Sequence, residues 1–192
     1  AYLPAFAAAP GHDRITVRYL LSHSSGLFTT DLLWQHSRNR QELLALIDHM
    51  PVAWAPGSHY QYRDENLILM GEIVERLSGK PLDRFLQDKA FGPLGMKDTG
   101  FNPPARRRDR IAPTEQDDVF RHRLIRGEVH DENAYVLGGV AGHAGLFSTA
   151  RDLAKLAELY LRDGRGLLKP STIAAFTTRQ AEPPGTSRAL GW

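Results

Sequence analysis

The segment that decides the fold spans residues 55–79 and reads APGSHYQYRDENLILMGEIVERLSG. It opens with Pro56-Gly57, a dipeptide typical of a turn. A helix is predicted next, since apolar residues recur at helical spacing before the stop signals Gly79 and Pro81; they are Met70, Ile73, Val74 and Leu77. A polar loop joined to a buried helix can hold a reacting side chain still. We therefore expect Tyr62, in this loop, to carry chemistry.

The sequence as a whole predicts one mainly helical domain that spans residues 1–192. Residues 1–14 are rich in alanine and proline and are expected to form an extended connector, followed by a helical region over 15–100. Residues 101–147 are expected to be irregular loops rich in glycine and arginine, and 148–192 to form C-terminal helices. Shorter predictions within these ranges are helices opened by Thr16, over Asp31–Trp34, over Gln41–Met50 and from Pro81, a strand at Gly100-Phe101, and a capping box at Thr149–Asp152.

The composition excludes several classes of function. The chain has 192 residues, of which 42% are hydrophobic, and a formal charge of +2, so no global field attracts nucleic acid or a membrane. It has no cysteine, which excludes disulfides and thiolate chemistry. No apolar run reaches the roughly 20 residues of a membrane-spanning helix. The arginines of residues 102–126 suggest a phosphate-binding patch, but the interleaved acidic residues favour a solvated loop.

Three further stretches accompany the turn and helix: ITVRYLLSHSSGL at 15–27, FGPLGMKDT at 91–99 and GHAGLFSTARDLA at 142–154. Together with Pro56-Gly57 and Tyr62-Arg63-Asp64, they resemble the penicillin-recognising serine hydrolases, a family of β-lactamases, DD-peptidases and class C-type esterases. The order of the stretches agrees over almost the whole chain. The resemblance implies an α+β fold, of which this chain is the mainly helical portion, with most of the antiparallel sheet outside it.

Two motifs of that family are missing. Its nucleophile lies in Ser-x-x-Lys, but no lysine here has a serine three positions earlier. His143-Ala144-Gly145 superficially matches the family's Lys-or-His-x-Gly strand, yet the capping box that follows predicts a helix, so that strand is expected beyond Trp192. The resemblance thus implies a central fragment of a hydrolase, inactive alone.

The resemblance assigns Tyr62 the role of shuttling a proton at the nucleophile. A phenol with a pKa near 10 is a poor base unless cations lower that pKa; the alternative is a buried tyrosine with a satisfied hydroxyl. Asp64 stands where the family has asparagine and can only accept hydrogen bonds. We expect Asp64 to bind substrate or to anchor the nearby lysine, which favours an ester or an altered cell-wall peptide over a β-lactam. Arg63 and Glu65 are interpreted as solvated loop charges.

Three more residues are candidates for lining the substrate site: Trp54, His130 and His143. Two of them have a simpler interpretation: Trp54 is a core aromatic, and His130 together with Asp131 braces a glycine-rich loop. His23 is interpreted as a helix-end residue that satisfies backbone groups. A metal held by His130, Asp131 and His143 is a weaker hypothesis because their spacing matches no helical metal-binding pattern, and we expect neither metal nor cofactor.

The function predicted for the full-length protein is a serine hydrolase that forms an acyl-serine on a small ester or a cell-wall peptide. The alternative is a non-catalytic, hydrolase-derived module that binds cell-wall peptide or sugar. Neither compartment nor oligomeric state follows from these residues, although the resemblance favours a periplasmic or secreted bacterial protein.

Overall fold

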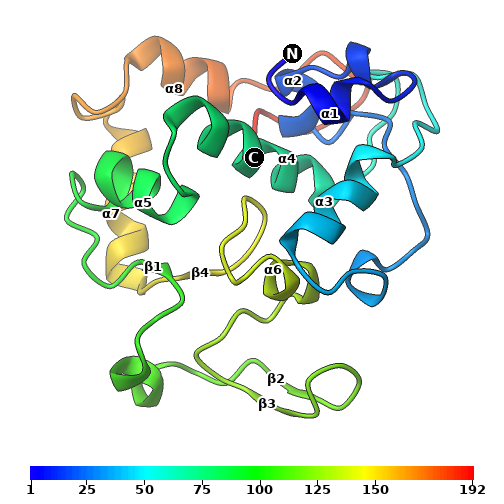
Figure 1. Cartoon of the computed structure of the whole chain (residues 1–192). Coiled ribbons are helices and arrows are strands. Elements are labelled where there is room, and N and C mark those ends of the chain that lie inside the picture. Colours follow the sequence, from blue (N-terminus) through cyan, green and yellow to red (C-terminus); the bar gives the residue numbers. More distant parts are fainter.

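The computed structural model describes residues 1–192 and is built around one central helix, α4 (Asp64–Ser78). α4 ends at Gly79, whose φ of +67° is the left-handed conformation that a helix C-terminus favours. Figure 1 shows α4 crossing the middle of the molecule, with α1 (Pro4–Ala7), α2 (Val17–Leu21) and α3 (Arg40–Asp48) towards one side of it. The predicted turn-helix segment is therefore the structural centre of the chain.

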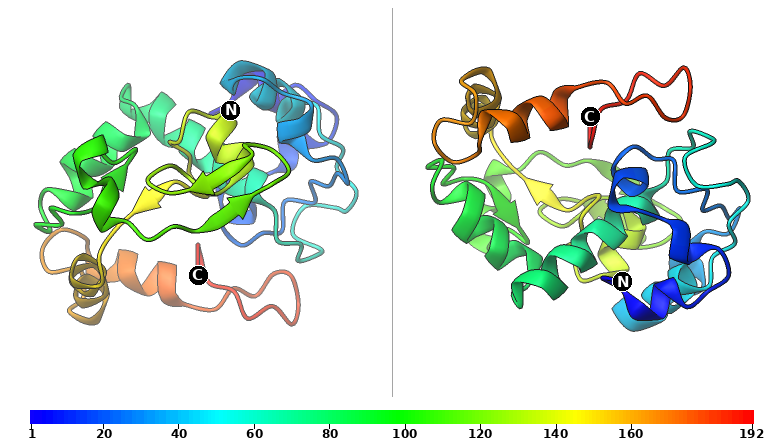
Figure 2. Two further views of the ribbon diagram at one scale, coloured as in Figure 1. Left: turned by 90° about the horizontal axis from the view of Figure 1, so that it is seen from below. Right: turned by 90° about the horizontal axis from the view of Figure 1, so that it is seen from above.

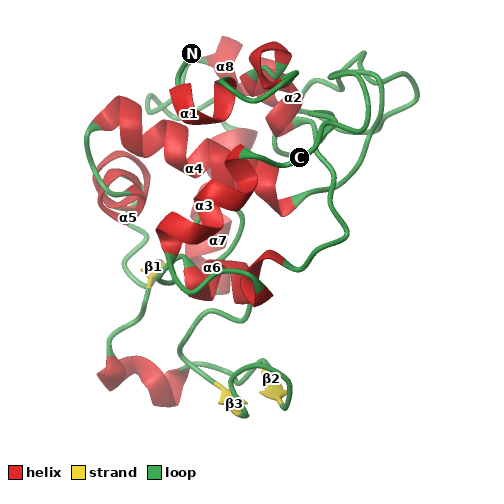
Figure 3. Ribbon diagram, turned by 45° about the vertical axis from the view of Figure 1, so that its right-hand side comes forward, coloured by secondary structure: helices red, strands yellow, loops and turns green.

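The remaining helices follow α4 in the chain. α5 (Leu82–Leu86) continues into a π-helical turn at Gln87–Phe91, and α6 (Glu132–Val136), α7 (Ala150–Leu161) and α8 (Pro170–Thr177) follow along the chain. Helices dominate the molecule (Figure 3). No helix is both long enough and apolar enough to span a bilayer.

Strands are few and short. β1 (Gly100–Phe101) pairs antiparallel with β4 (Leu146–Phe147), and β2 (Glu115–Asp117) pairs antiparallel with β3 (Arg123–Ile125). The β2–β3 hairpin projects from the helical body at the bottom of Figure 1, and in the left view of Figure 2, seen from below, it lies in front of the rest of the chain. The strand predicted at Gly100-Phe101 is confirmed.

The core lies where α1, α3, α4 and α6 meet. Its fully buried members include Leu27, Leu43, Ile47, Ile68 and Leu69. The helix predicted over Gln41–Met50 is confirmed as α3, and Leu43, Ile47 and the following Met50 are buried. The stripe predicted for α4 is wrong at Leu77, which is 65% exposed because the last turn of α4 extends past the core.

The predicted extended connector over residues 1–14 is wrong. Pro4 occupies the first turn of α1, where a missing N–H costs nothing, and a 3₁₀ turn follows at His12–Arg14. Phe6 and His12 are buried, and the His12 ring bridges the carbonyl oxygens of Phe6 and Met50 at 2.9 and 2.8 Å. The hydrogen bond to Met50, a residue distant in sequence, makes this segment part of the core. Local sequence patterns do not predict such a contact.

Two other predictions also need correction. The helix predicted at Asp31–Trp34 is only a 3₁₀ turn at Leu33–Gln35. The irregular segment 101–147 contains β1, β4, the β2–β3 hairpin, a 3₁₀ helix at Ala105–Arg110 and α6. By contrast, the predicted caps are present, since Thr16 and Thr149 accept hydrogen bonds from the backbone N–H groups of Tyr19 and Asp152.

The segment 179–192 returns to α2. Arg18 donates to the Gln180 side chain, the Tyr19 hydroxyl donates to Glu182 at 3.2 Å, and the Gly191 N–H donates to the Leu21 carbonyl at 3.0 Å. This return brings Arg188 next to the loop that precedes α4.

Candidate functional site

Tyr62 lies in the loop that feeds α4, and its ring is half exposed. The ring stacks on buried His23, with centroids 4.5 Å apart and planes inclined at 28°. His23 also holds the loop itself, because its carbonyl accepts from the Gln61 N–H at 2.9 Å and its Nδ1 accepts from the Arg63 N–H at 3.2 Å. Tyr62 is therefore both accessible and fixed in position, while its catalytic role remains a prediction.

His23 has a larger role than that of a helix-end residue. Its backbone adopts φ +53°, and the Asn66 amide nitrogen lies 3.3 Å from its Nδ1. The sequence signal available was the SHSSG turn, where a histidine tolerates the left-handed region better than bulkier residues. Burial, followed by the nearby positive charge of Arg188, lowers the pKa of His23.

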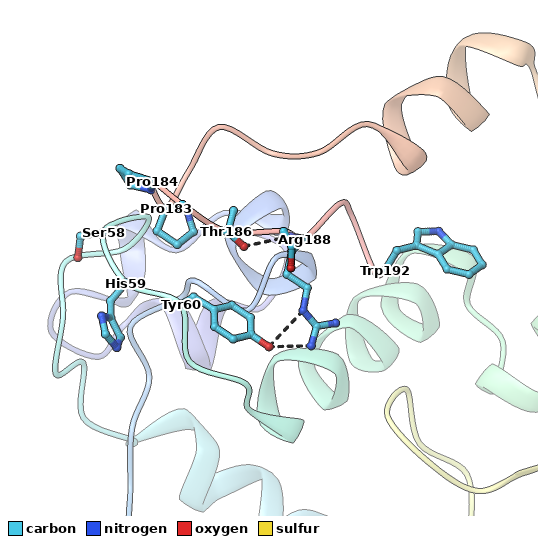
Figure 4. Close-up of a pocket in the computed structure, with 10 residues that line it drawn as sticks. Ser58, His59, Tyr60, Pro183, Pro184, Thr186, Arg188 and Trp192 are labelled. Atoms are coloured by element: carbon cyan, nitrogen blue, oxygen red, sulfur yellow. Dashed lines mark hydrogen bonds between the residues drawn. The ribbon is translucent and has the colours of Figure 1, made fainter.

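Arg188 borders Tyr62 as well, at the edge of a cavity. Its guanidinium lies 5.3 Å from the Tyr60 ring centroid and 5.8 Å from that of Tyr62, and its Nη2 and Nε donate to the Tyr60 hydroxyl at 2.7 and 3.1 Å. A cavity of about 660 Å³ lies between the turn at Ser58–Tyr60 and the segment 183–188 (Figure 4). No sequence signal pointed to Arg188, because the contact depends on the return of a distant segment.

Asp64, Asp131 and His143 converge beside Tyr62 from three segments. Asp64 is the first residue of α4, Asp131 caps α6 by accepting from the Ala134 N–H at 2.7 Å, and His143 lies in a glycine-rich loop. The Nε2 of His143 is 2.9 Å from Asp131 Oδ1, and one ligand atom from each of the three residues lies within 4.8 Å of the others. The predicted residues Asp64 and His143 are thus brought together.

Close backbone contact brings the loop of His143 onto α4. A Cβ at Gly142 would lie 2.0 Å from the Leu67 carbonyl oxygen and 3.0 Å from the Gly71 nitrogen. A Cβ at Gly71 would in turn lie 3.1 Å from the Gly142 nitrogen. Two residues without side chains therefore let the loop pack directly on the helix.

The charges around Tyr62 are mainly negative. Burial, and then the Asp64 and Asp131 carboxylates, raise the pKa of the Tyr62 phenol, and Arg188 opposes this only in part. The Arg188 guanidinium lowers that pKa, as expected of a cation, but burial and the carboxylates outweigh it and the net shift is upward. Burial raises the pKa of Asp131, but hydrogen bonds from His143 and the α6 backbone outweigh burial, and the net shift is downward.

Trp54 and His130 lie outside this group. Trp54 is half-buried, stacks on His59 at a centroid distance of 4.6 Å and meets Phe28 edge to face at 5.2 Å. His130 is half exposed and pairs with Glu115 at 3.5 Å. The weaker hypothesis of a metal held by His130, Asp131 and His143 is wrong, because His130 lies outside the group that Asp131 and His143 form with Asp64. The substrate-binding roles of Trp54 and His130 remain predictions.

The interpretation of Arg63 and Glu65 as solvated loop charges is wrong. The two side chains form a two-pronged pair at 2.9 and 3.0 Å, and Glu65 is buried. Arg63 also donates to the Thr29 carbonyl and lies over the Phe28 ring. The pair therefore stiffens the start of α4 directly behind Tyr62.

Comparison with known proteins agrees with this geometry. The family model described as Beta-lactamase matches residues 1–192. The chain is 35% identical over 221 aligned residues to a protein of Escherichia coli K12 named "Putative D-alanyl-D-alanine carboxypeptidase", covering 100% of this chain and 50% of that protein. The Salmonella schwarzengrund protein of the same name is 34% identical, with the same coverage. The chain thus spans about half the length of these relatives.

Solved structures show the same fold. A β-lactamase/D-alanine carboxypeptidase from Pseudomonas syringae superposes with a TM-score of 0.77 at 21% identity, covering 100% of this chain and 51% of the other. A penicillin-binding protein homologue from Caulobacter crescentus gives 0.69 at 23% identity, covering 99% and 57%. The predicted fold, a mainly helical portion of the β-lactamase and penicillin-binding protein architecture, is confirmed.

Proposed function

Because this chain belongs to the β-lactamase family, we propose that it contributes to a serine hydrolase that acts through an acyl-serine on an ester or a cell-wall peptide. The relatives of E. coli and Salmonella, named as carboxypeptidases that act on D-alanyl-D-alanine, support the peptide class. In this proposal Tyr62 relays the proton between the attacking serine and the leaving group.

The observation that carries the proposal is the fixed and accessible phenol of Tyr62. A proton relay has to reach the reacting atoms, and the ring is half exposed. It also has to be preorganised, and the His23 stack together with the Arg63–Glu65 pair restrains its loop. The expected alternative of a sealed tyrosine does not fit this exposure.

Asp64 shapes the proposed substrate preference. An ionised aspartate accepts hydrogen bonds but cannot donate one to a substrate carbonyl as an asparagine amide does. The carboxylate also adds negative charge beside the phenol, together with Asp131. We therefore rank esters, and peptides that present a donor or a cation, above β-lactams.

The attacking serine and its lysine are proposed to come from a segment outside these 192 residues. Their Ser-x-x-Lys spacing is not found in this chain. The chain alone should therefore not form an acyl-enzyme, whereas a longer product of the same reading frame should be labelled by a fluorescent penicillin or by an activated ester.

The test compares two proteins and two tyrosines. We expect the 192-residue chain to leave a nitrophenyl ester intact, and the longer product to hydrolyse it with at least about a 100-fold loss in Tyr62→Phe, within the range for general acid–base catalysis. The matched control is Tyr2→Phe, at an exposed tyrosine outside the loop that carries Tyr62. Hydrolysis by the short chain that Tyr62→Phe abolishes would refute the external serine. An equal loss in Tyr2→Phe would refute the role of Tyr62.

A further inference from the structure

Two adjoining cavities in the segment 103–128, at the bottom of Figure 1, are lined by arginines. Pro103 lines both of them. The larger cavity, of about 490 Å³, is bordered by Arg108, Arg123 and Arg126, and the smaller, of about 300 Å³, by Arg107 and Arg110.

The larger cavity holds an excess of positive charge. Its only carboxylate, Glu128, is paired with Arg123 at 2.6 and 3.0 Å. Arg108 and Arg126 form no ion pair with a carboxylate of the chain, so two positive charges face the cavity unpaired. The hydrogen bond from Arg123 lowers the pKa of Glu128 against the effect of burial, and the charge of Arg108 adds to this. Negative charge is therefore stabilised at this place.

The smaller cavity has the same imbalance. Its only carboxylate, Asp98, lies 3.2 Å from Arg107 and 3.7 Å from Arg110, so one acid serves two arginines. Over the two cavities, five arginines face two carboxylates. This excess of positive charge is larger than the formal charge of +2 of the whole chain. The fold thus concentrates positive charge on this face.

The acidic residues that alternate with these arginines in the sequence do not neutralise this face. The other four acids of the segment line neither cavity; they are Asp109, Glu115, Asp117 and Asp118. Asp117 is buried in its pair with Arg121, and Glu115 lies beside His130. The two signs are interleaved along the chain, and the fold separates them.

The unpaired arginines are held in position. Arg126 donates to the carbonyl oxygens of Ile111 and Asp109 at 2.7 and 2.8 Å, which fixes its guanidinium without neutralising it and leaves further N–H donors. Gly127 adopts φ +74°, and a Cβ there would lie 3.3 Å from Cγ of Arg108, so the stem of Arg108 packs on this turn. A prearranged site loses less conformational entropy when a ligand binds.

The chemistry of the larger cavity fits a phosphate monoester. Guanidinium groups bind phosphate and carboxylate through two parallel hydrogen bonds. Two unpaired arginines match the charge of a phosphate monoester, about −1.5 to −2 at pH 7, whereas one carboxylate would leave a cation unmatched. The volume lies within the range of small-molecule sites, about 300–1,000 Å³, and leaves room for the group that carries the phosphate.

We propose that Arg108, Arg123 and Arg126 bind the phosphate monoester of a small polar molecule, a polyol or a sugar, in the larger cavity. The site goes beyond the proposed hydrolase function and does not depend on it, because none of these arginines belongs to the group around Tyr62.

The test is calorimetric titration of glycerol 1-phosphate into the longest product of the reading frame that contains this chain, at pH 7.5 in a phosphate-free buffer of low salt. We expect saturable binding at one site per chain, weakened by added salt because ions screen the attraction. Arg108→Gln should weaken the affinity at least about 10-fold, since it removes a charged hydrogen-bond donor. Glycerol and sodium acetate should give no comparable heat.

The matched control is Arg106→Gln. It removes the same charge from the same 3₁₀ helix, at an exposed side chain that lines neither cavity, so the affinity should change less than about twofold. Circular dichroism establishes that both variants are folded, and Arg108 is exposed, so its replacement leaves the core intact. Equal losses in the two variants, or acetate binding as tightly as the phosphate ester, would overturn the proposal.

Sedimentation with phosphatidylcholine vesicles that contain phosphatidic acid distinguishes a soluble ester from a lipid headgroup. Vesicle binding that Arg108→Gln abolishes would support the site with a lipid as the source of the phosphate. Binding of glycerol 1-phosphate without vesicle binding would support it with a soluble ester. Failure of both probes to bind would refute the site.

Discussion

Two regions of the molecule hold charged groups partly or fully out of solvent, and they differ in how those charges are paired. In the β2–β3 hairpin, the Asp117 carboxylate accepts from the N–H groups of Val119, Phe120 and Arg121 and pairs with the Arg121 guanidinium at 2.7 Å. Arg121 also donates to the carbonyls of Val129 and His130. These bonds hold the pKa of Asp117 well below its usual range. Each charge in the hairpin has its partners.

The cluster beside α4 differs. Asp64 and Asp131 have no arginine or lysine partner, and the buried Nδ1 of His143 is unsatisfied. Evolution rarely leaves buried polar capacity unused without a functional reason. The hairpin therefore uses its charges to build structure, whereas the charges of the cluster are not neutralised by an arginine or lysine of this chain.

The largest expected effect concerns the β2–β3 hairpin, where the buried charges are paired. Arg121→Met leaves the Asp117 carboxylate buried without its cation, which is a strongly destabilising change. We expect the unfolding temperature to fall on the order of 10 °C, measured by thermal denaturation. Arg123→Met, in the exposed pair with Glu128, serves as the control and should change little. If both variants unfold alike, the hairpin is not held by its buried pair.

The next effect concerns the contact that holds the loop of His143 against α4. Gly142→Ala places a methyl group 2.0 Å from the Leu67 carbonyl oxygen, so the loop of His143 has to move away from α4. We expect a loss of about 1–3 kcal/mol in the free energy of unfolding, the usual cost of overpacking. The control is Gly100→Ala, because nothing lies within 4 Å of the added Cβ. Equal stability of the two variants in urea denaturation would contradict the close contact.

A smaller effect depends on pH. Because the pKa of His23 is lowered in the folded chain, the unfolded chain takes up a proton first as the pH falls below the ordinary value of about 6.5. The stability contribution of neutral His23 is complete above that value and is lost as the pH falls further. Urea midpoints should therefore decrease from pH 7.5 to pH 5.5, and less steeply in His23→Asn, which tolerates the same backbone. An unchanged slope would mean that His23 does not govern this dependence.

The smallest expected effect concerns Tyr62. Its ring is half exposed, so Tyr62→Phe should change the free energy of unfolding by no more than about 0.5 kcal/mol in chemical denaturation. A loss comparable to that in Gly142→Ala would mean that the Tyr62 hydroxyl contributes to the stability of the fold.

Local signals in the sequence are enough to predict several helix ends and one strand. The end of α4, the caps Thr16 and Thr149 and the strand at Gly100-Phe101 all depend on residues a few positions apart. The connector over residues 1–14 was wrong for the opposite reason, since His12 is held by the distant Met50.

The site could be predicted only in part. Tyr62, Asp64 and His143 came from family resemblance and from residue type, but the grouping of Asp64 with Asp131 and His143 depends on the contact between Gly71 and Gly142. Arg188 reaches Tyr60 only because the segment 179–192 returns to α2. Both arrangements are tertiary contacts that no spacing in the sequence encodes.

The contact between Gly71 and Gly142 has one more consequence. Since main chain meets main chain there, the separation between the helix and the loop is set independently of which side chains point into the space beside them. Substitutions at positions 64 and 143 are therefore expected to change the chemistry of this corner while the framework keeps its dimensions.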